Sequence, residues 1–135
     1  MIQEKSIDSL KTFLASAKES FSSYIDSVDL DACRQAAELI IASQADGNRI
    51  HVTGIGKPAH VAAYAASHLS STGNPAAFLH GTEAVHGSCG QLVAGDVVIA
   101  ISNSGETVEL KATVNAIHNN GCKVIAVTGN PDSWL

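Results

Sequence analysis

The sequence predicts an α/β fold, in which helices alternate with the strands of a parallel sheet. Four short apolar segments are typical of strands, at 49–53, 76–80, 97–101 and 123–128. Helical patterns separate them, and strands that alternate with helices form parallel sheets through right-handed crossovers. The composition agrees, because hydrophobic residues make up 45% of the chain and aromatic residues only 4%. A core of Ala, Val, Ile and Leu suits helices packed on a parallel sheet.

Two helical patterns precede the first predicted strand. The apolar residues of the first pattern recur at spacings of three, four or seven and form one stripe: Ile7, Leu10, Leu14, Phe21, Ile25 and Val28. This spacing predicts a long amphipathic helix that packs either on the rest of the domain or on a second subunit. A second helix is predicted from Leu30, with Asp29 as its N-cap and Gly47 after its end. We assign residues 1–47 to these N-terminal helices and residues 48–135 to the sheet domain.

Glycine residues end the two predicted helices of the sheet domain. The pattern predicts helices at 58–72 and 107–120, closed by Gly73 and Gly121. In open parallel sheets, ligands bind beyond the carboxyl ends of the strands. The positions of interest for function therefore directly follow the predicted strand ends Thr53, His80, Ile101 and Thr128.

The strongest functional signal is the loop Ser102-Asn103-Ser104-Gly105-Glu106-Thr107, between a buried strand and a helix. A helix N-terminus attracts phosphate through its unpaired N–H groups and the positive end of its dipole. Gly105 lets the backbone approach the anion, and the neighbouring hydroxyls can donate hydrogen bonds. We expect the free amides of residues 104–107 to hold a phosphate group. The simpler alternative is that Ser104 only caps the helix, with Thr107 as the third helical residue.

Charge and cysteine content argue against several classes of partner. The net charge is −5 and the 8 Lys and Arg residues are scattered, so we expect no nucleic-acid partner. The cysteines Cys33, Cys89 and Cys122 lack C-x-x-C spacing, which argues against a disulfide framework and favours a reducing compartment. The N-terminus is polar and no apolar run approaches the length of a membrane span. We therefore expect a cytoplasmic protein with no membrane partner.

Several of these motifs resemble the sugar isomerase (SIS) domain family. The loop at 102–107 is similar to the phosphosugar-binding signature of that family. Three further segments, at 52–57, 69–73 and 79–87, are similar in the same order to its arabinose-5-phosphate isomerase branch. The resemblance covers residues 49–134. It implies a three-layer αβα SIS-type fold with a parallel sheet, a sugar phosphate ligand, and aldose-ketose isomerisation without a cofactor.

Lys57 and Glu106 match residues that the family uses in its active site. Moving a carbonyl between C1 and C2 needs a base for a carbon-bound proton and a stabiliser for the enediolate. Glu106, beside the phosphate loop, suits the base, and Lys57, after the first strand, suits the stabiliser. We assign His86 to proton transfer in ring opening. Without the resemblance, Glu106 is typical of a first-turn glutamate and Lys57 of a solvated surface lysine.

Other predicted site residues fall into two groups. The predicted phosphate ligands are Ser102, Asn103, Ser104, Gly105 and Thr107. The predicted sugar contacts are Gly54, Gly56, His80 and Glu83. Glu83 and His86 share a face on a helical turn, but this spacing matches no standard zinc pattern and we expect no metal. The remaining histidines are expected to be structural or solvent-facing: His51, His60, His68 and His118.

The chain departs from the family pattern in two places. Where the family continues Lys-Ser-Gly-His, this chain has Lys57-Pro58-Ala59-His60, and where Asp-Leu-Gly is usual it has Ser88-Cys89-Gly90. Residues 130–135 are typical of the opening turn of another helix. Because four strands with the last one uncovered would leave an apolar face or edge exposed, we expect the domain to be incomplete at its C-terminus. The resemblance implies further active-site residues beyond this point.

Two other functions are compatible with parts of the sequence. A SIS domain that senses a sugar phosphate without catalysis needs only the phosphate loop. A dinucleotide-binding oxidoreductase is the second alternative, because Gly54-x-Gly56-x-x-Ala59 satisfies the relaxed NAD(P) fingerprint. The next strand, however, offers no acidic residue for a ribose before Glu83. The resemblance also implies a homo-oligomer, either dimer or tetramer, in which neighbouring chains complete the pocket.

Overall fold

The structure is a computed structural model that describes residues 2–135, with side chains from residue 5 onward. Met1, the first residue of the predicted N-terminal segment, lies outside the described residues. The contacts divide the chain into two compact units between Arg34 and Gln35. This division falls inside the second helix, and the boundary proposed after residue 47 stays a prediction. None of the helices in the described part of the chain is long and apolar enough to cross a membrane.

The predicted long amphipathic helix is confirmed as α1, Ile2–Asp26. Its large apolar side chains are 53 to 65% exposed: Ile7, Leu10, Phe13, Leu14, Phe21, Tyr24 and Ile25. Helix α2, Leu30–Ala45, follows. The Asp29 carboxylate accepts a hydrogen bond from the N–H of Ala32 at 2.9 Å, which confirms the predicted N-cap. Gly47 has a φ of 81°, the left-handed conformation expected after a helix end.

Four parallel strands form one sheet in the order β2-β1-β3-β4. Their bounds are β1 Ile50–Gly54, β2 Ala76–His80, β3 Val97–Ile101 and β4 Lys123–Val127. All four predicted strands are confirmed to within one residue at each end. The first strand lies in the middle of the sheet, between β2 and β3. The chain adds β2 on one side of β1 and then adds β3 on the other side. The place between β1 and β3 where the strand order changes side is the topological switch point at which such sheets bind ligands.

Helices cover both faces of this sheet. Their bounds are α3 Lys57–Ser71, α4 Gly81–Ala84 and α5 Val108–Asn119, with a 3₁₀ turn at Ser88–Gln91. The first and last of these helices were predicted to within one residue. The sequence pattern missed α4 and the 3₁₀ turn, because four residues are too few to display a helical period.

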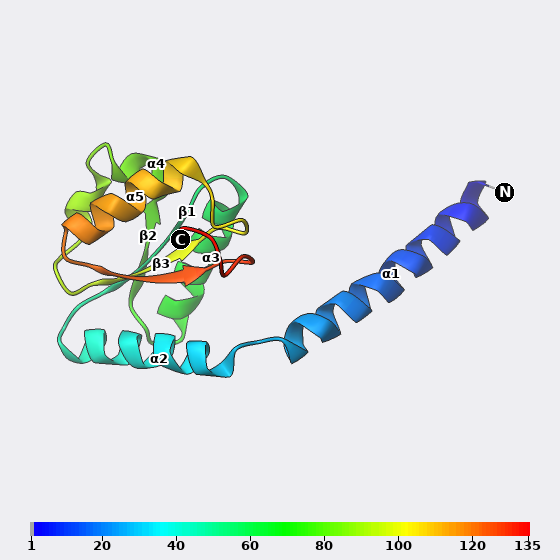
Figure 1. Cartoon of the computed structure of the whole chain (residues 1–135), viewed down its shortest axis with the longest axis horizontal. Coiled ribbons are helices and arrows are strands. Elements are labelled where there is room, and N and C mark those ends of the chain that lie inside the picture. The colour runs from blue at the N-terminus through cyan, green and yellow to red at the C-terminus, as the bar shows by residue number, and fades with distance from the viewer. Residues whose placement is uncertain (1) are drawn as a thin grey trace. The chain divides into compact units, whose positions relative to one another are not determined.

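Successive side chains of β3 pack against helices on opposite faces of the sheet. Ile99 packs in the cluster that contains Ala62 of α3. Val98 packs in the cluster that contains Ile117 of α5. Because successive strand residues point to opposite faces, α3 and α5 lie on opposite sides of the sheet, as Figure 1 shows. The predicted three-layer αβα fold with a parallel sheet is confirmed.

A buried histidine–aspartate hydrogen bond joins β1 to the residue that directly precedes β3. His51 Nε2 lies 3.0 Å from Asp96 Oδ2, and both side chains are almost fully buried. The Asp96 carboxylate also accepts hydrogen bonds from the N–H groups of Arg49 and Val93, each at 2.9 Å. Burial alone would raise the pKa of Asp96, but these hydrogen bonds and His51 together hold that pKa below its usual value. His51 is therefore a structural residue, as expected.

Replacing the buried carboxylate is expected to destabilise the fold in a pH-dependent way. Because the folded-state pKa of Asp96 is lowered, its contribution is present above the unfolded-state pKa of about 3.9 and is lost as pH falls through the folded-state value. Asp96→Asn should lower the unfolding free energy at pH 7 by about 2 to 4 kcal/mol. Urea unfolding at pH 7 and pH 3 measures this, with exposed Asp46→Asn as the control. An equal loss at both pH values would contradict the assignment.

Candidate functional site

The carboxyl ends of the strands meet in one row. Gly54 at the end of β1 is in register with His80 of β2 and with Ile101 of β3, and Ile101 is in register with Val127 of β4. The segments that follow these four residues therefore start side by side. Most predicted site residues lie in these segments, so the sheet brings together loops that are far apart in the sequence.

Lys57 and Glu106 follow neighbouring strands of this row. Lys57 is the first residue of α3, three positions after the end of β1. Glu106 lies in the loop between β3 and α5. Both side chains belong to exposed residues, and adjacent parallel strands are about 5 Å apart. Lys57 and Glu106, two of the three predicted catalytic residues, therefore extend from adjacent loops at the same edge of the sheet.

Hydroxyl groups hold the loop between β3 and α5 in shape. Ser102 is buried, and its Oγ accepts a hydrogen bond from the N–H of Gly105 at 3.2 Å. The same oxygen lies 3.0 Å from Thr107 Oγ1, so the two hydroxyls share a hydrogen bond. Ser104 Oγ accepts from the N–H of Glu106 at 3.2 Å. The loop is thus held in shape by hydrogen bonds to its own serine and threonine side chains.

The structure rules out the simpler alternative for this loop and corrects one expectation. Ser104 is not the helix cap, because α5 begins at Val108 and its N-cap position is Thr107, whose side chain makes no capping hydrogen bond. The amides of Gly105 and Glu106 are also not free, since they donate to the side chains of Ser102 and Ser104. The reason is that short serine side chains satisfy nearby backbone donors in tight turns. The amides left for an anion lie at the helix start, where the first helical N–H groups lack intrahelical partners.

Gly105 permits a close approach between this loop and the segment after β4. Its φ is 67°, in the left-handed region. A Cβ at this position would collide with the side chain of Ser133 and lie 2.9 Å from Thr128 Oγ1. The carbonyl of Asn103 also accepts a hydrogen bond from the N–H of Gly129 at 3.0 Å. Residues 128–135 therefore border the loop. The sequence indicated this segment only because it follows the carboxyl end of a predicted strand, where open parallel sheets bind ligands.

The Glu106 side chain contacts this last segment. Its Oε1 accepts a hydrogen bond from the main-chain N–H of Trp134 at 3.2 Å. The Trp134 ring packs against the apolar cluster of Ala100, Leu110 and Val114, and the Lys111 ammonium lies 5.6 Å from the ring centroid. The predicted opening of another helix at 130–135 is a turn in this structure.

The segment after β2 brings the remaining predicted residues to the same edge. His80 is the N-cap of α4, and its Nδ1 accepts from the N–H of Glu83 at 3.3 Å. α4 ends at Ala84, so His86 lies in the following turn, and the residues Glu83 and His86 are exposed. In the described part of the chain, no group of three His, Cys, Asp or Glu residues is placed to hold a metal ion.

Two glycines allow the helices to start close to the strand ends. A Cβ on Gly54 would lie 2.8 Å from the carbonyl carbon of Pro58, so α3 begins directly against β1. Gly56, the residue before α3, has a φ of 67°, and no atom lies within 4 Å of the position that a Cβ would take there. Gly54 is therefore required by packing, whereas Gly56 is favoured by its backbone conformation.

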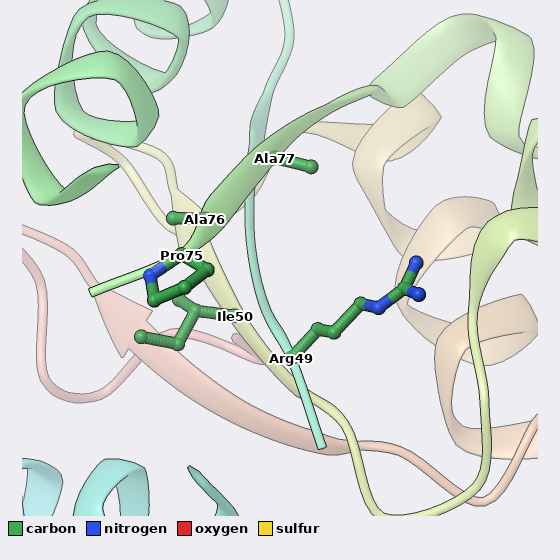
Figure 2. A pocket seen from close by; sticks show the side chains of 5 residues that line it. All are labelled: Arg49, Ile50, Pro75, Ala76 and Ala77. Atoms are coloured by element: carbon green, nitrogen blue, oxygen red, sulfur yellow. The ribbon is translucent and has the colours of Figure 1, made fainter. Parts of the chain in front are cut away.

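A hollow of about 170 Å³ lies at the opposite end of the sheet. It is lined by Arg49, Ile50, Pro75, Ala76 and Ala77, at the amino ends of β1 and β2. Figure 2 shows the Arg49 side chain extending away from Pro75 and Ile50. Its lining lacks the hydroxyls and helix N-terminus that a phosphate needs. The loops at the carboxyl edge remain the better candidate for the functional site.

Two solved structures that resemble this chain are described as a phosphosugar isomerase or as a complex with a sugar phosphate. A putative phosphosugar isomerase involved in capsule formation from Bacteroides fragilis aligns with a TM-score of 0.83 at 35% identity, over 93% of this chain and 67% of that one. A protein of E. coli CFT073 solved in complex with arabinose 5-phosphate aligns with a TM-score of 0.80 at 37% identity, over 96% of this chain and 66% of that one.

The SIS domain family model matches residues 44–135. Arabinose 5-phosphate isomerase KdsD of Pseudomonas aeruginosa is 39% identical over 129 residues, which cover 91% of this chain and 39% of that protein. The protein of the same name from Francisella tularensis is 41% identical over 101 residues, covering 75% of this chain and 31% of that protein. The chain belongs to the SIS domain family, and it spans less than half the length of these relatives.

Adding a single methyl group to the loop is expected to disrupt anion binding. Gly105→Ala places a Cβ against Ser133 and forces a non-glycine residue into a left-handed conformation. We expect phosphate affinity to fall at least about ten-fold, with a loss of about 1 to 3 kcal/mol of stability. Isothermal titration with inorganic phosphate measures the affinity.

The matched control for this variant is Gly90→Ala, since no atom lies within 4 Å of its added Cβ. This control should keep both stability and phosphate affinity. If Gly105→Ala bound phosphate as well as the control did, the loop would not be the anion site.

Proposed function

We propose that this chain is the phosphosugar-binding part of an aldose-ketose isomerase that acts on a sugar phosphate such as arabinose 5-phosphate. The observation that carries the proposal is the serine-built loop at the N-terminus of α5, adjacent to the strand that leads to Lys57. The relatives named arabinose 5-phosphate isomerase and the solved complex with that sugar phosphate support this substrate class. Because the chain covers less than half of those relatives, the activity is proposed for the protein to which this domain belongs.

The phosphate group is proposed to bind at the start of α5. The amides of Val108 and Glu109 are among the first helical N–H groups, and the dipole of the helix is positive there. Ser104 and Thr107 offer hydroxyl oxygens beside these amides, and Asn103 lines the same loop. Ser102 is buried and acts from behind the loop by fixing its shape. The net charge of the protein is −5 and does not attract an anion, so hydrogen-bond donors in the loop must hold the phosphate.

The isomerisation is proposed to use two residues from neighbouring loops. The Glu106 carboxylate removes the proton from the carbon next to the carbonyl and returns it to the former carbonyl carbon, while the hydroxyl proton of the first carbon passes to the former carbonyl oxygen. The Lys57 ammonium stabilises the negative oxygen of the enediolate that forms between these steps. His86 transfers the proton that opens the sugar ring. The proposed sugar contacts from the loops after β1 and β2 are Gly54, Gly56, His80 and Glu83.

The proposal includes a homo-oligomer in which the stripe of α1 pairs with a second copy of the chain. The residues Ile7, Leu10, Leu14, Ala17, Phe21, Tyr24 and Val28 recur with the alternating spacing of three and four that coiled-coil helices use. Most of the large members are more than half exposed in the single chain.

The three cysteines are free, which supports a reducing compartment and hence the cytoplasm as the place where the protein works.

A base variant separates an isomerase from a non-catalytic sensor of sugar phosphates. Glu106→Gln keeps the size of the side chain but cannot remove a proton, so turnover should fall by about 10² to 10⁴. Ligand binding should persist, as measured by thermal shift with pentose, hexose and amino-sugar phosphates.

The full-length protein and this chain should be assayed in parallel with the same sugar phosphates. Binding without turnover in both wild-type proteins would support the sensor instead of the isomerase. A change in NADH fluorescence on mixing would favour the oxidoreductase alternative, and we expect none.

The oligomer proposal predicts that one charge in the stripe separates the subunits. Leu14→Glu places a carboxylate at the centre of the apolar stripe and should reduce the mass in multi-angle light scattering from a dimer or tetramer to a monomer. Ser16→Glu, on the opposite side of the same helix, should leave the mass unchanged. A monomeric parent chain would contradict the proposal.

A further inference from the structure

The Glu106 carboxylate has one protein contact that its proposed role does not use. Glu106 is an exposed residue in a loop, and a glutamate in water samples several rotamers. Here the main-chain N–H of Trp134 donates a hydrogen bond to its Oε1 at 3.2 Å. The two residues are 28 positions apart in the sequence. The contact therefore depends on the tertiary fold rather than on local sequence.

The donor itself is held in place from two sides. The Trp134 ring is partly buried and packs with Leu135 against the cluster of Ala100, Leu110 and Val114. Lys111, on the first turns of α5, lies with its ammonium 5.6 Å from the ring centroid. The helix that begins two residues after Glu106 therefore also contacts the residue that holds Glu106.

The turn that precedes Trp134 is fixed by its own hydrogen bonds. The Ser133 hydroxyl donates to the carbonyl of Asn130 at 2.7 Å, and the N–H of Asp132 donates to Asn130 Oδ1 at 3.2 Å. The N–H of Asn130 in turn donates to Thr128 Oγ1 at 3.1 Å. This chain of contacts connects the end of β4 to Trp134 and keeps its N–H directed at the loop.

We propose that Trp134 is a positioning residue for Glu106, which holds the carboxylate through its main-chain N–H while its ring is clamped between Lys111 and the apolar cluster. This inference rests on the proposed isomerase function for its kinetic consequence, but not for the hydrogen bond itself. Restricting the carboxylate to one orientation favours proton transfer, because a base that is misplaced by about 1 Å can lose about 10² in rate.

Nuclear magnetic resonance tests the hydrogen bond without any substrate. In the ¹⁵N-labelled chain, Glu106→Gln should shift the Trp134 amide proton upfield and speed its exchange with solvent, because a carboxylate is the stronger acceptor. The control is Glu109→Gln, which removes a charge from the start of the same helix and should leave the Trp134 resonance in place. An unchanged Trp134 amide in Glu106→Gln would overturn the proposal.

Kinetics of the chain with a sugar phosphate substrate tests the consequence. Trp134→Pro removes the N–H, whereas Trp134→Phe keeps the N–H and an aromatic ring. We expect kcat to fall at least about ten-fold further in Trp134→Pro than in Trp134→Phe, with KM changed less than about two-fold. Equal kcat values, or a loss carried by KM, would overturn the positioning role.

A double variant separates positioning from damage to the fold. In a Glu106→Ala background, Trp134→Pro should reduce the residual kcat by less than about two-fold, because the group through which it acts is gone. Multiplicative losses would indicate a purely structural effect and overturn the proposal. Absence of turnover in the wild-type enzyme would contradict the isomerase function, and the amide resonance would still decide whether Trp134 holds Glu106.

Discussion

The close approach of Gly105 to the segment after β4 is the constraint on which the candidate site depends. Only a residue without a Cβ leaves room for Ser133, and only glycine adopts a φ of 67° at little cost. That conformation turns the chain so that Ser102 receives the Gly105 amide and α5 starts two residues after Glu106. The position of the helix N-terminus, and with it the proposed phosphate site, follows from this turn.

The two ends of the sheet solve different physical problems. At the amino end, the buried Asp96 carboxylate is surrounded by donors from His51, Arg49 and Val93, and this fully bonded group joins the central strands. At the carboxyl end, the loops carry exposed polar residues, and only some of their polar groups form hydrogen bonds with one another. The Asp96 carboxylate is thus bonded inside the protein, whereas the candidate site lies among exposed residues at the other end of the sheet.

The segment after β4 connects the sheet, the loop between β3 and α5, and the proposed base. Its backbone reaches Asn103 through Gly129 and reaches Glu106 through Trp134. Rearrangement of this segment on ligand binding would therefore affect phosphate binding and proton transfer together. Lys57 has no such support from the segment, since it projects from the start of α3 on the neighbouring strand connection. Lys57 and Glu106 are thus positioned by different parts of the fold.

The sequence by itself determined the four strands, the longer helices and the serine-rich loop, because periodicity, caps and glycine stops are local properties of the chain. It also indicated Lys57 and Glu106, because both lie in segments that resemble the motifs of the SIS family. Only the tertiary structure decided which amides of the loop are used internally, that Thr107 rather than Ser104 is the helix cap, and that Trp134 contacts Glu106. Such contacts join residues far apart in the sequence or depend on the exact turn of the backbone, and no local pattern records them.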